Sequence, residues 1–116
     1  MPPEDLIRLI EDAEDQWVAS RAIAAVVASG SKPALHAMLG SRRAQARAAA
    51  LLALDAAVPH PRVEELMWDR NRRVRRAAQW VGQREGIDVA ADYLARWDAE
   101  RDPLALIAAG EVGVPL

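Results

Sequence analysis

The stretch Val74-Arg75-Arg76-Ala77-Ala78-Gln79-Trp80-Val81-Gly82 indicates which fold class the whole chain adopts. Its apolar residues recur at the 3-4-3 spacing of an amphipathic helix: Val74, Ala77, Ala78 and Val81. The 116 residues include 25 alanines and no phenylalanine or cysteine. Alanine is the best helix former, and small side chains let helices pack closely. The composition therefore predicts an all-α protein.

The same pattern recurs 28 residues earlier, which indicates a repeat protein. Ala46-Arg47-Ala48-Ala49-Ala50 lies over Val74-Arg75-Arg76-Ala77-Ala78 at that shift. Apolar positions of the preceding segments also coincide: Leu35, Met38 and Leu39 with Val63, Leu66 and Met67. Carried further, the shift reaches apolar residues near both ends: Ile7, Ile10, Ala91 and Leu94.

Glycines and prolines between these patterns delimit eight short helices. The expected helices span residues 4–14, 16–29, 33–39, 42–57, 61–68, 71–85, 87–98 and 103–109. Ser31, His60 and Asp102 precede or nearly precede first-turn prolines and are expected to cap three of them. In the helix from Asn71 the polar side is expected to face away from the core: Arg72, Arg76, Gln79 and Gln83.

Paired in order, the helices form four antiparallel hairpins that bury their apolar faces by stacking. The sequence predicts a single domain over residues 1–116 with units at 4–29, 31–57, 60–86 and 87–110, and a tail at 111–116. A globular helical bundle is the alternative fold. The constant 28-residue spacing argues against it, because a bundle has no reason to repeat its core positions.

The run from Val74 to Gly82 resembles the second-helix signature of HEAT repeats, especially the short bacterial type that includes PBS-lyase repeats. The resemblance is closest over residues 31–86, extends to 4–30, and is poor after 87. It implies a right-handed α-solenoid of about four HEAT-like hairpins. Such a signature is informative about the fold and nearly silent about function.

A pair of residues six positions apart carries part of this resemblance. Asp69 and Arg75 match the Asp and Arg that form a stacking ladder in that family, and Asp15 and Arg21 reproduce the spacing. Ser41 replaces the acid before Arg47, and Pro103 stands at the ladder-arginine position of the last unit. The resemblance therefore implies architectural roles for Arg47 and Arg75.

Residue types that carry chemistry are sparse and scattered. His36 and His60 are the only histidines and have no further ligands at metal-binding spacing. The acids of the first helix suit a solvated capping face, and no Gly-rich phosphate motif or nucleophile elbow occurs. We therefore expect a protein that is not an enzyme and that holds no cofactor or metal. The acidic N-terminus and the lack of a long apolar run predict a cytoplasmic protein without membrane contact.

Charge is distributed unevenly along the chain. Residues 1–15 carry a net charge of −5, residues 16–84 of +8, and residues 85–116 of −5. The cations of the central segment are nearly all arginines, which suit planar contacts to carboxylate or phosphate. The arginines whose presence is least explained by the repeat architecture are the candidate partner-binding residues: Arg43, Arg70, Arg72, Arg73 and Arg76.

Three of the four tryptophans are expected to serve mainly in packing: Trp68, Trp80 and Trp97. Trp80 stands at an apolar repeat position, as Leu52 does one unit earlier, and is predicted to be in the core. Trp68 follows residues that already serve the core, so it is also a candidate partner-binding anchor.

Three functions remain open from the sequence. The first is a protein-interaction scaffold whose arginines hold an acidic segment of another protein. The second is a nucleic-acid-binding protein that contacts phosphates, as some bacterial HEAT-like proteins do. The third is an accessory subunit or homo-oligomer, because the final helix is apolar enough to form end contacts through Leu104, Leu106 and Ile107. Enzymatic activity is the least favoured class, although phycobilin lyases share this broad repeat type.

Overall fold

The computed structural model describes residues 1–114, and over that range all regular structure is helical. The prediction of an all-α protein is confirmed. The chain divides into two compact units, Met1–Val58 (unit 1) and Pro59–Leu116 (unit 2). Residues 115 and 116 of the predicted tail lie outside the described residues, and Glu111 belongs to the last helix.

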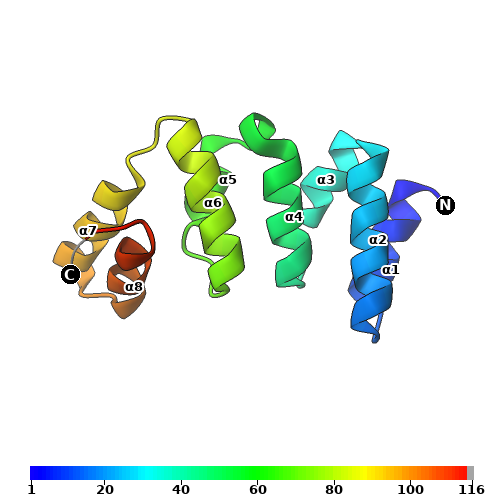
Figure 1. Cartoon of the computed structure of the whole chain (residues 1–116), viewed down its shortest axis with the longest axis horizontal. Helices are drawn as coiled ribbons and strands as arrows, with labels where there is room; N and C mark the ends of the chain where they lie inside the picture. Colours follow the sequence, from blue (N-terminus) through cyan, green and yellow to red (C-terminus); the bar gives the residue numbers. More distant parts are fainter. Residues whose placement is uncertain (115–116) are drawn as a thin grey trace. The chain divides into compact units, whose positions relative to one another are not determined.

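Unit 1 consists of two helical hairpins (Figure 1). Its elements are α1 (Pro3–Asp12), α2 (Gln16–Ser29), α3 (Lys32–Met38), α4 (Ala44–Leu54) and the short 3-10 turn η1 (Asp55–Ala57). Helix α1 packs on α2, and α3 packs on α4. Since α1 also contacts α3 while α2 contacts α4, the two hairpins stack as two layers within this unit.

Unit 2 contains the remaining four α-helices of the described chain (Figure 1). They are α5 (His60–Leu66), α6 (Arg72–Arg84), α7 (Val89–Glu100) and α8 (Pro103–Glu111). Helix α5 packs on α6, α7 packs on α8, and α6 also contacts α7. Side chains from the end of α8 reach α6 as well, so α6 has neighbours on two sides.

Short polar side chains fix where several helices begin. The hydroxyl of Ser31 accepts a hydrogen bond from the Ala34 amide, and the carboxylate of Asp102 accepts one from Leu104. The caps predicted at Ser31 and Asp102 are therefore confirmed. The cap predicted at His60 is wrong, because His60 is the first residue of α5 and the N-cap position is Pro59, without a side-chain cap hydrogen bond. Asn71 caps α6 by accepting from two backbone amides of its first turn, which satisfies donors that a helix start otherwise leaves unpaired.

Alanines line the contacts between the helices. Fully buried examples are Ala19, Ala46, Ala50, Ala78, Ala105, Ala108 and Ala109. The predicted inward stripe of α6 is buried as expected: Val74, Ala77, Ala78 and Val81. Small side chains at these positions let the helices approach closely, while larger side chains such as Leu51, Met67 and Tyr93 fill the rest of the core.

Two predictions of burial are wrong. Trp80 is 46% exposed instead of lying in the core, whereas Gln79, expected at the surface, is 3% exposed. Gln79 is buried because Tyr93 and the end of α8 cover it, whereas the position of Trp80 is exposed in both units, since Leu52 is 52% exposed. In α7, Tyr93 and Val89 are buried and Ala91 is exposed, so the 28-residue register does not extend to this helix.

One contact recurs in both units. The Arg47 guanidinium donates to the backbone carbonyl of Ser41 at 2.8 Å, and that of Arg75 donates to the carbonyl of Asp69 at 3.1 Å. In each case the acceptor lies six residues before the arginine, in the turn that precedes the helix. These two arginines therefore fix the entry into α4 and α6.

Candidate functional site

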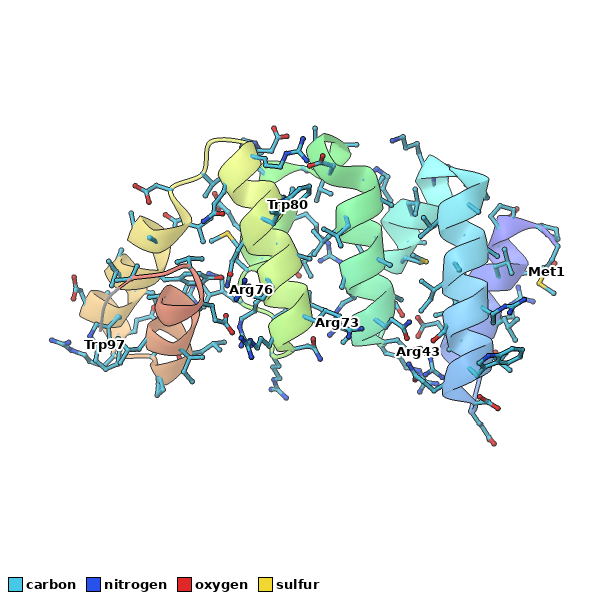
Figure 2. All side chains as sticks on the ribbon, viewed as in Figure 1. Met1, Arg43, Arg73, Arg76, Trp80 and Trp97 are labelled. Atoms are coloured by element: carbon cyan, nitrogen blue, oxygen red, sulfur yellow. The ribbon has the colours of Figure 1, made fainter. Side chains whose placement is uncertain are left out.

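The exposed side of α6 brings together most of the arginines that the sequence singled out. Positions three and four apart share one side of a helix, so the exposed residues form a continuous stripe. We call this stripe the α6 face; it consists of Arg72, Arg73, Arg76, Trp80, Gln83 and Arg84. Figure 2 shows Arg73, Arg76 and Trp80 following one another along the helix.

Arg75, in the middle of the same helix, is excluded from this face by burial. Its side chain is 6% exposed, and that of Glu111 is 7% exposed. The Nε and Nη2 atoms of Arg75 donate to the two carboxylate oxygens of Glu111 at 3.0 and 2.8 Å. A bidentate pair of this kind uses the arginine's fork fully. Arg75 is therefore a structural residue, as the resemblance implied.

Burial and hydrogen bonding act against each other on the pKa of Glu111. Burial alone raises that pKa, but hydrogen bonds from Arg75 and Gln79 outweigh it and hold the pKa below the usual range. The hydrogen bond to Glu111 likewise raises the pKa of Arg75, although burial lowers it. Both groups are therefore charged at neutral pH and neutralise each other.

Gln79 and Tyr93 complete this buried network. The Gln79 amide donates to the Tyr93 hydroxyl at 3.2 Å and to Glu111 at 3.1 Å. The Tyr93 hydroxyl in turn donates to the carbonyl of Met67 at 2.6 Å. The network ties α6 to α7, to the end of α8 and to the turn after α5.

The arginines of the α6 face differ sharply from Arg75 in their partners. Within the part of the chain that the structure describes, the side chains of Arg73 and Arg76 make no hydrogen bond or ion pair, and both are exposed. Arg72 is 74% exposed and lies 3.7 Å from Glu111. Arg70, in the turn before α6, is exposed as well and uses only its backbone carbonyl, which Arg75 binds.

Trp80 places an aromatic surface among these cations. The guanidinium of Arg84 stacks over its ring at 4.5 Å from the centroid, a cation–π contact that holds the indole in place. Exposed tryptophan beside arginine is the combination that dominates protein-binding hot spots. Trp80, which the sequence assigned to the core, therefore belongs to the candidate site.

A hollow adjoins the α6 face where the chain turns after α8. Its volume is about 320 Å³, and it is lined by Arg76, Gln79, Trp80, Gln83, Glu111, Val112 and Gly113. Gly113 has a φ of +88°, a conformation that suits glycine, and the turn closes with hydrogen bonds from Gly113 to Gly110 and from Val114 to Ala109. This turn fixes the wall that faces Arg76.

Arg43 lies in unit 1 and is used there for architecture (Figure 2). Its guanidinium donates to the carbonyls of Ile10, at 2.5 Å, and Ala13, and to the side chain of Gln16 at 3.4 Å. These acceptors lie at the end of α1 and the start of α2. Because its donors are occupied, Arg43 is the weakest of the arginines that the sequence proposed for partner binding.

Trp68 is half-buried within unit 2. Its ring meets the Tyr93 ring edge to face with centroids 4.9 Å apart, and the Arg96 guanidinium stacks on it at 3.9 Å. Both contacts are internal, and this position agrees with the packing role favoured by the sequence. Trp68 is not part of the α6 face.

The residues proposed for end contacts do not form one exposed surface. In α8, Leu104 and Leu106 are half-buried, whereas Ile107 is 56% exposed. A single exposed aliphatic side chain is ordinary on a protein surface. Helix α8 is therefore a weaker candidate for a contact surface than the α6 face.

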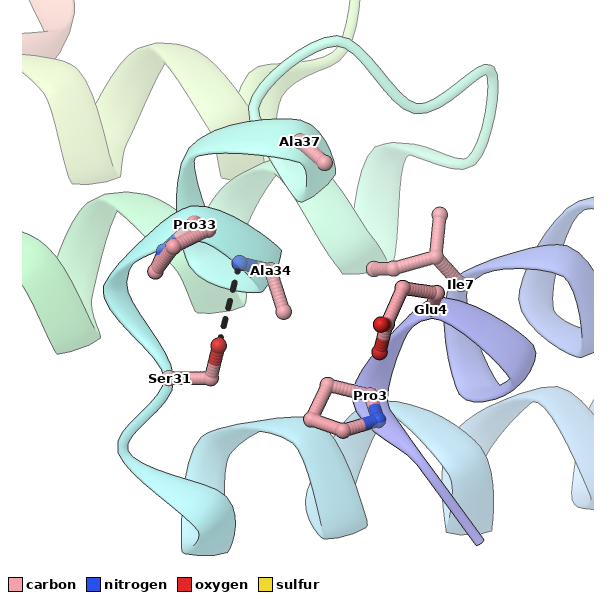
Figure 3. Close-up of a pocket in the computed structure, with 7 residues that line it drawn as sticks. All are labelled: Pro3, Glu4, Ile7, Ser31, Pro33, Ala34 and Ala37. Carbon is pink, nitrogen blue, oxygen red and sulfur yellow. Dashed lines mark hydrogen bonds between the residues drawn. The ribbon is translucent and has the colours of Figure 1, made fainter.

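A second hollow lies in unit 1 between α1 and α3 (Figure 3). It has a volume of about 380 Å³ and is lined by Pro3, Glu4, Ile7, Ser31, Pro33, Ala34 and Ala37. Most of these side chains are apolar, and the Ser31 hydroxyl is already used to cap α3. The hollow contains none of the residues proposed from the sequence.

The described residues show no arrangement typical of a metal centre. Across residues 1–114, His, Asp and Glu side chains form no group of three or more that could hold an ion. His36 is exposed, and His60, also exposed, lies 3.9 Å from a carboxylate oxygen of Glu85. Within the same range each helix is too short or too polar to cross a lipid bilayer.

The sequence did not reveal the role of Gln79, Gln83 or Glu111. The spacing of Arg76, Trp80 and Gln83 over seven residues does place them on one helical side, and that signal was available. The contribution of Glu111, 36 residues after Arg75, depends on tertiary packing and has no local signature.

Comparisons with protein-family models, with curated proteins and with solved structures found no match. The function of the chain is therefore argued from the α6 face itself.

Proposed function

We propose that this chain is a non-catalytic protein-interaction module that binds an acidic segment of another protein along the α6 face. One observation carries the proposal. Arg73 and Arg76 are exposed and without partners in the described chain, although Arg75 between them is buried and neutralised. Exposed guanidinium groups without partners can bind carboxylates without first breaking an internal contact, and the helix fixes the positions from which they extend.

The repeat pattern shows that these arginines are not needed for the helix itself. At the positions 28 residues before Arg73 and Arg76 stand Gln45 and Ala48, whereas the buried Arg75 matches Arg47. The arginine that stabilises the repeat is therefore present in both units, as Arg47 and Arg75. The arginines of the α6 face, in contrast, occur only in unit 2. This difference supports a role in recognition.

A protein is favoured over a nucleic acid as the partner because Trp80 lies among the cations and because the chain is acidic overall. The formal net charge is −2, with acidic segments before and after the cationic one. A long polyanion such as duplex DNA would be repelled by these segments, whereas a short acidic peptide needs only the α6 face. Duplex DNA remains the alternative partner. If the protein does not bind duplex DNA at low salt, this alternative is rejected.

The architecture that we propose is a HEAT-like solenoid. The stacking of hairpins within unit 1 supports it, as does the arginine-to-carbonyl contact that recurs at Arg47 and Arg75. A cytoplasmic location and the absence of catalytic activity remain expectations from the sequence. A homo-oligomer that uses Ile107 is a lesser alternative, and a molar mass measured in solution tests it directly.

The proposal is tested by titrating a fluorescent peptide of consecutive glutamates with the purified protein at low ionic strength. We expect saturable binding to the wild type and its loss in the double variant Arg73→Glu/Arg76→Glu. The matched control is Arg8→Glu/Lys32→Glu, which changes the net charge equally at two exposed positions of unit 1. Equal losses in both variants would show a non-specific charge effect and would reject the α6 face as the site.

A further inference from the structure

The hollow beside the α6 face has the chemistry of a subsite for one carboxylate. It lies between one side of α6, at Arg76, Gln79, Trp80 and Gln83, and the turn that follows α8. All of these residues belong to unit 2. Some of these side chains already form hydrogen bonds within the protein, whereas others do not. The side chains without internal partners determine which ligand group the hollow can bind.

Two lining side chains have free donors. Among residues 1–114, neither the guanidinium of Arg76 nor the amide of Gln83 makes a hydrogen bond. They are seven residues apart on α6, two helical turns along the same side. Between them, Gln79 is held rigid, because its amide donates to both Tyr93 and Glu111. The free donors of Arg76 and Gln83 therefore lie on either side of Gln79, whose side chain is fixed by its own hydrogen bonds.

The charge of the hollow is positive despite its own carboxylate. Both oxygens of Glu111 accept hydrogen bonds from Arg75, and Arg72 lies 3.7 Å from one of them. Two guanidinium groups, those of Arg75 and Arg72, thus lie against a single carboxylate, and Arg76 adds a third cation to the lining of the same hollow. An additional negative charge is attracted there, and the acceptor capacity of Glu111 is already used.

Trp80 gives the hollow an apolar wall. Its ring is held by Arg84, and it lies one turn beyond Arg76. The methylene groups of an acidic side chain can rest against such a ring while the carboxylate reaches the guanidinium. The flat, bidentate geometry of arginine suits a carboxylate better than the point charge of a lysine would.

We propose that the hollow binds the carboxylate of one glutamate or aspartate side chain of the partner, with Arg76 as the bidentate donor, Gln83 as a second donor and Trp80 as the wall. This inference rests on the proposed function and adds a specific anchor to it. The other arginines of the α6 face, Arg72 and Arg73, attract the rest of the acidic segment without a defined pocket.

The test compares substitutions that keep the charge but remove the geometry. The probe is the glutamate peptide described above. We expect Arg76→Lys to weaken its binding by about tenfold, because one charge-assisted hydrogen bond is lost. Gln83→Ala is expected to weaken it by about threefold, and Arg73→Lys to have a smaller effect than Arg76→Lys. Arg8→Lys in unit 1 is the control.

NMR spectroscopy shows whether the peptide contacts the hollow itself, which affinity measurements alone do not show. The side-chain NH signals of Arg76 and Trp80, assigned from the variants Arg76→Lys and Trp80→Phe, should shift on titration, while that of Trp17 in unit 1 should not. Equal effects of Arg76→Lys and Arg73→Lys, with no effect of Gln83→Ala, would overturn the subsite and leave the proposed function intact. A wild-type protein that does not bind the peptide would overturn both.

Discussion

The guanidinium of Arg75 and the carboxylate of Glu111 form a buried bidentate ion pair between α6 and the last turn of α8. Replacing Glu111 by leucine should leave the arginine charge buried without its counter-ion. Breaking one side of such a pair costs about 3–5 kcal/mol of unfolding free energy. Urea denaturation followed by circular dichroism measures the loss.

Two variants make this prediction specific. Arg72→Met removes an exposed partner of Glu111 and should cost no more than about 1 kcal/mol, as surface pairs do. The double variant Arg75→Met/Glu111→Leu should be more stable than Glu111→Leu alone, because no charge is left unpaired. If Arg72→Met destabilised unit 2 as strongly as Glu111→Leu, burial of the pair would not be the cause.

The lowered pKa of Glu111 predicts a loss of stability in acid. A carboxyl whose pKa is lower in the folded state stabilises the protein above its unfolded pKa, about 4.3 for glutamate, and this contribution is lost as the pH falls through the folded pKa. Thermal unfolding midpoints between neutral pH and pH about 3 should therefore decrease less in Glu111→Gln than in the wild type. Equal decreases in the two proteins would contradict the prediction.

Tyr93 is the single tyrosine of the chain, so its ionisation can be followed by ultraviolet absorbance. Burial raises the pKa of Tyr93 to about 12, although the hydrogen bond with Gln79 acts in the opposite direction. Its contribution to stability is complete below the unfolded pKa of about 10 and is lost as the pH rises through the folded pKa. Absorbance should therefore titrate near pH 12 in the native protein and near 10 in urea.

Tyr93→Phe should weaken unit 2 by about 1–3 kcal/mol, because the carbonyl of Met67 then lacks its donor in a buried position. The variant retains the ring that packs on Trp68, so the decrease in unfolding free energy reports the contribution of the hydroxyl alone. Denaturation at neutral pH gives the value. An unchanged midpoint would mean that water replaces the lost hydrogen bond.

Arg43→Ala should destabilise unit 1 by about 2 kcal/mol through loss of charged hydrogen bonds to backbone carbonyls. Amide hydrogen exchange should accelerate around the turn between α1 and α2. Binding of the glutamate peptide should not change, because the α6 face belongs to unit 2. Weaker peptide binding with unchanged exchange would instead place Arg43 in the binding site.

Trp80→Ala should separate binding from stability. The side chain is 46% exposed, so its removal should cost about 1 kcal/mol or less of unfolding free energy. Peptide binding should weaken by about tenfold or more if the ring acts as an anchor. Leu52→Ala is the matched control, at an exposed apolar position 28 residues earlier in unit 1.

The helices were predictable because their signals are local. Proline and cap positions such as Ser31 and Asp102 determine where helices begin, and the apolar stripe of α6 determines which side is buried. The burial of Gln79 was not predictable from the sequence, because it depends on which segment covers α6. That segment is the end of α8, 32 residues beyond Gln79.

The site was predictable only in part. The cluster of arginines was visible as a local excess of one residue type, but arginines with opposite roles alternate within it. Arg75 is neutralised and Arg76 is free. The match to Arg47 assigns Arg75 to the repeat architecture, but its neutralisation by Glu111 has no local signature in the sequence. The same limit applies to Arg43, whose acceptors lie 30 and 33 residues earlier in the chain.

Because Glu111 is contributed by α8, the recognition properties of α6 can be altered from a distant point in the sequence. A substitution there removes the counter-ion of Arg75 and the ion-pair partner of Arg72, and a change at Gly113 reshapes the wall opposite Arg76. Related proteins could thus diverge in what they bind while every arginine of α6 is retained. The last turn of α8 is accordingly a place to look for specificity differences, and a place from which to engineer them.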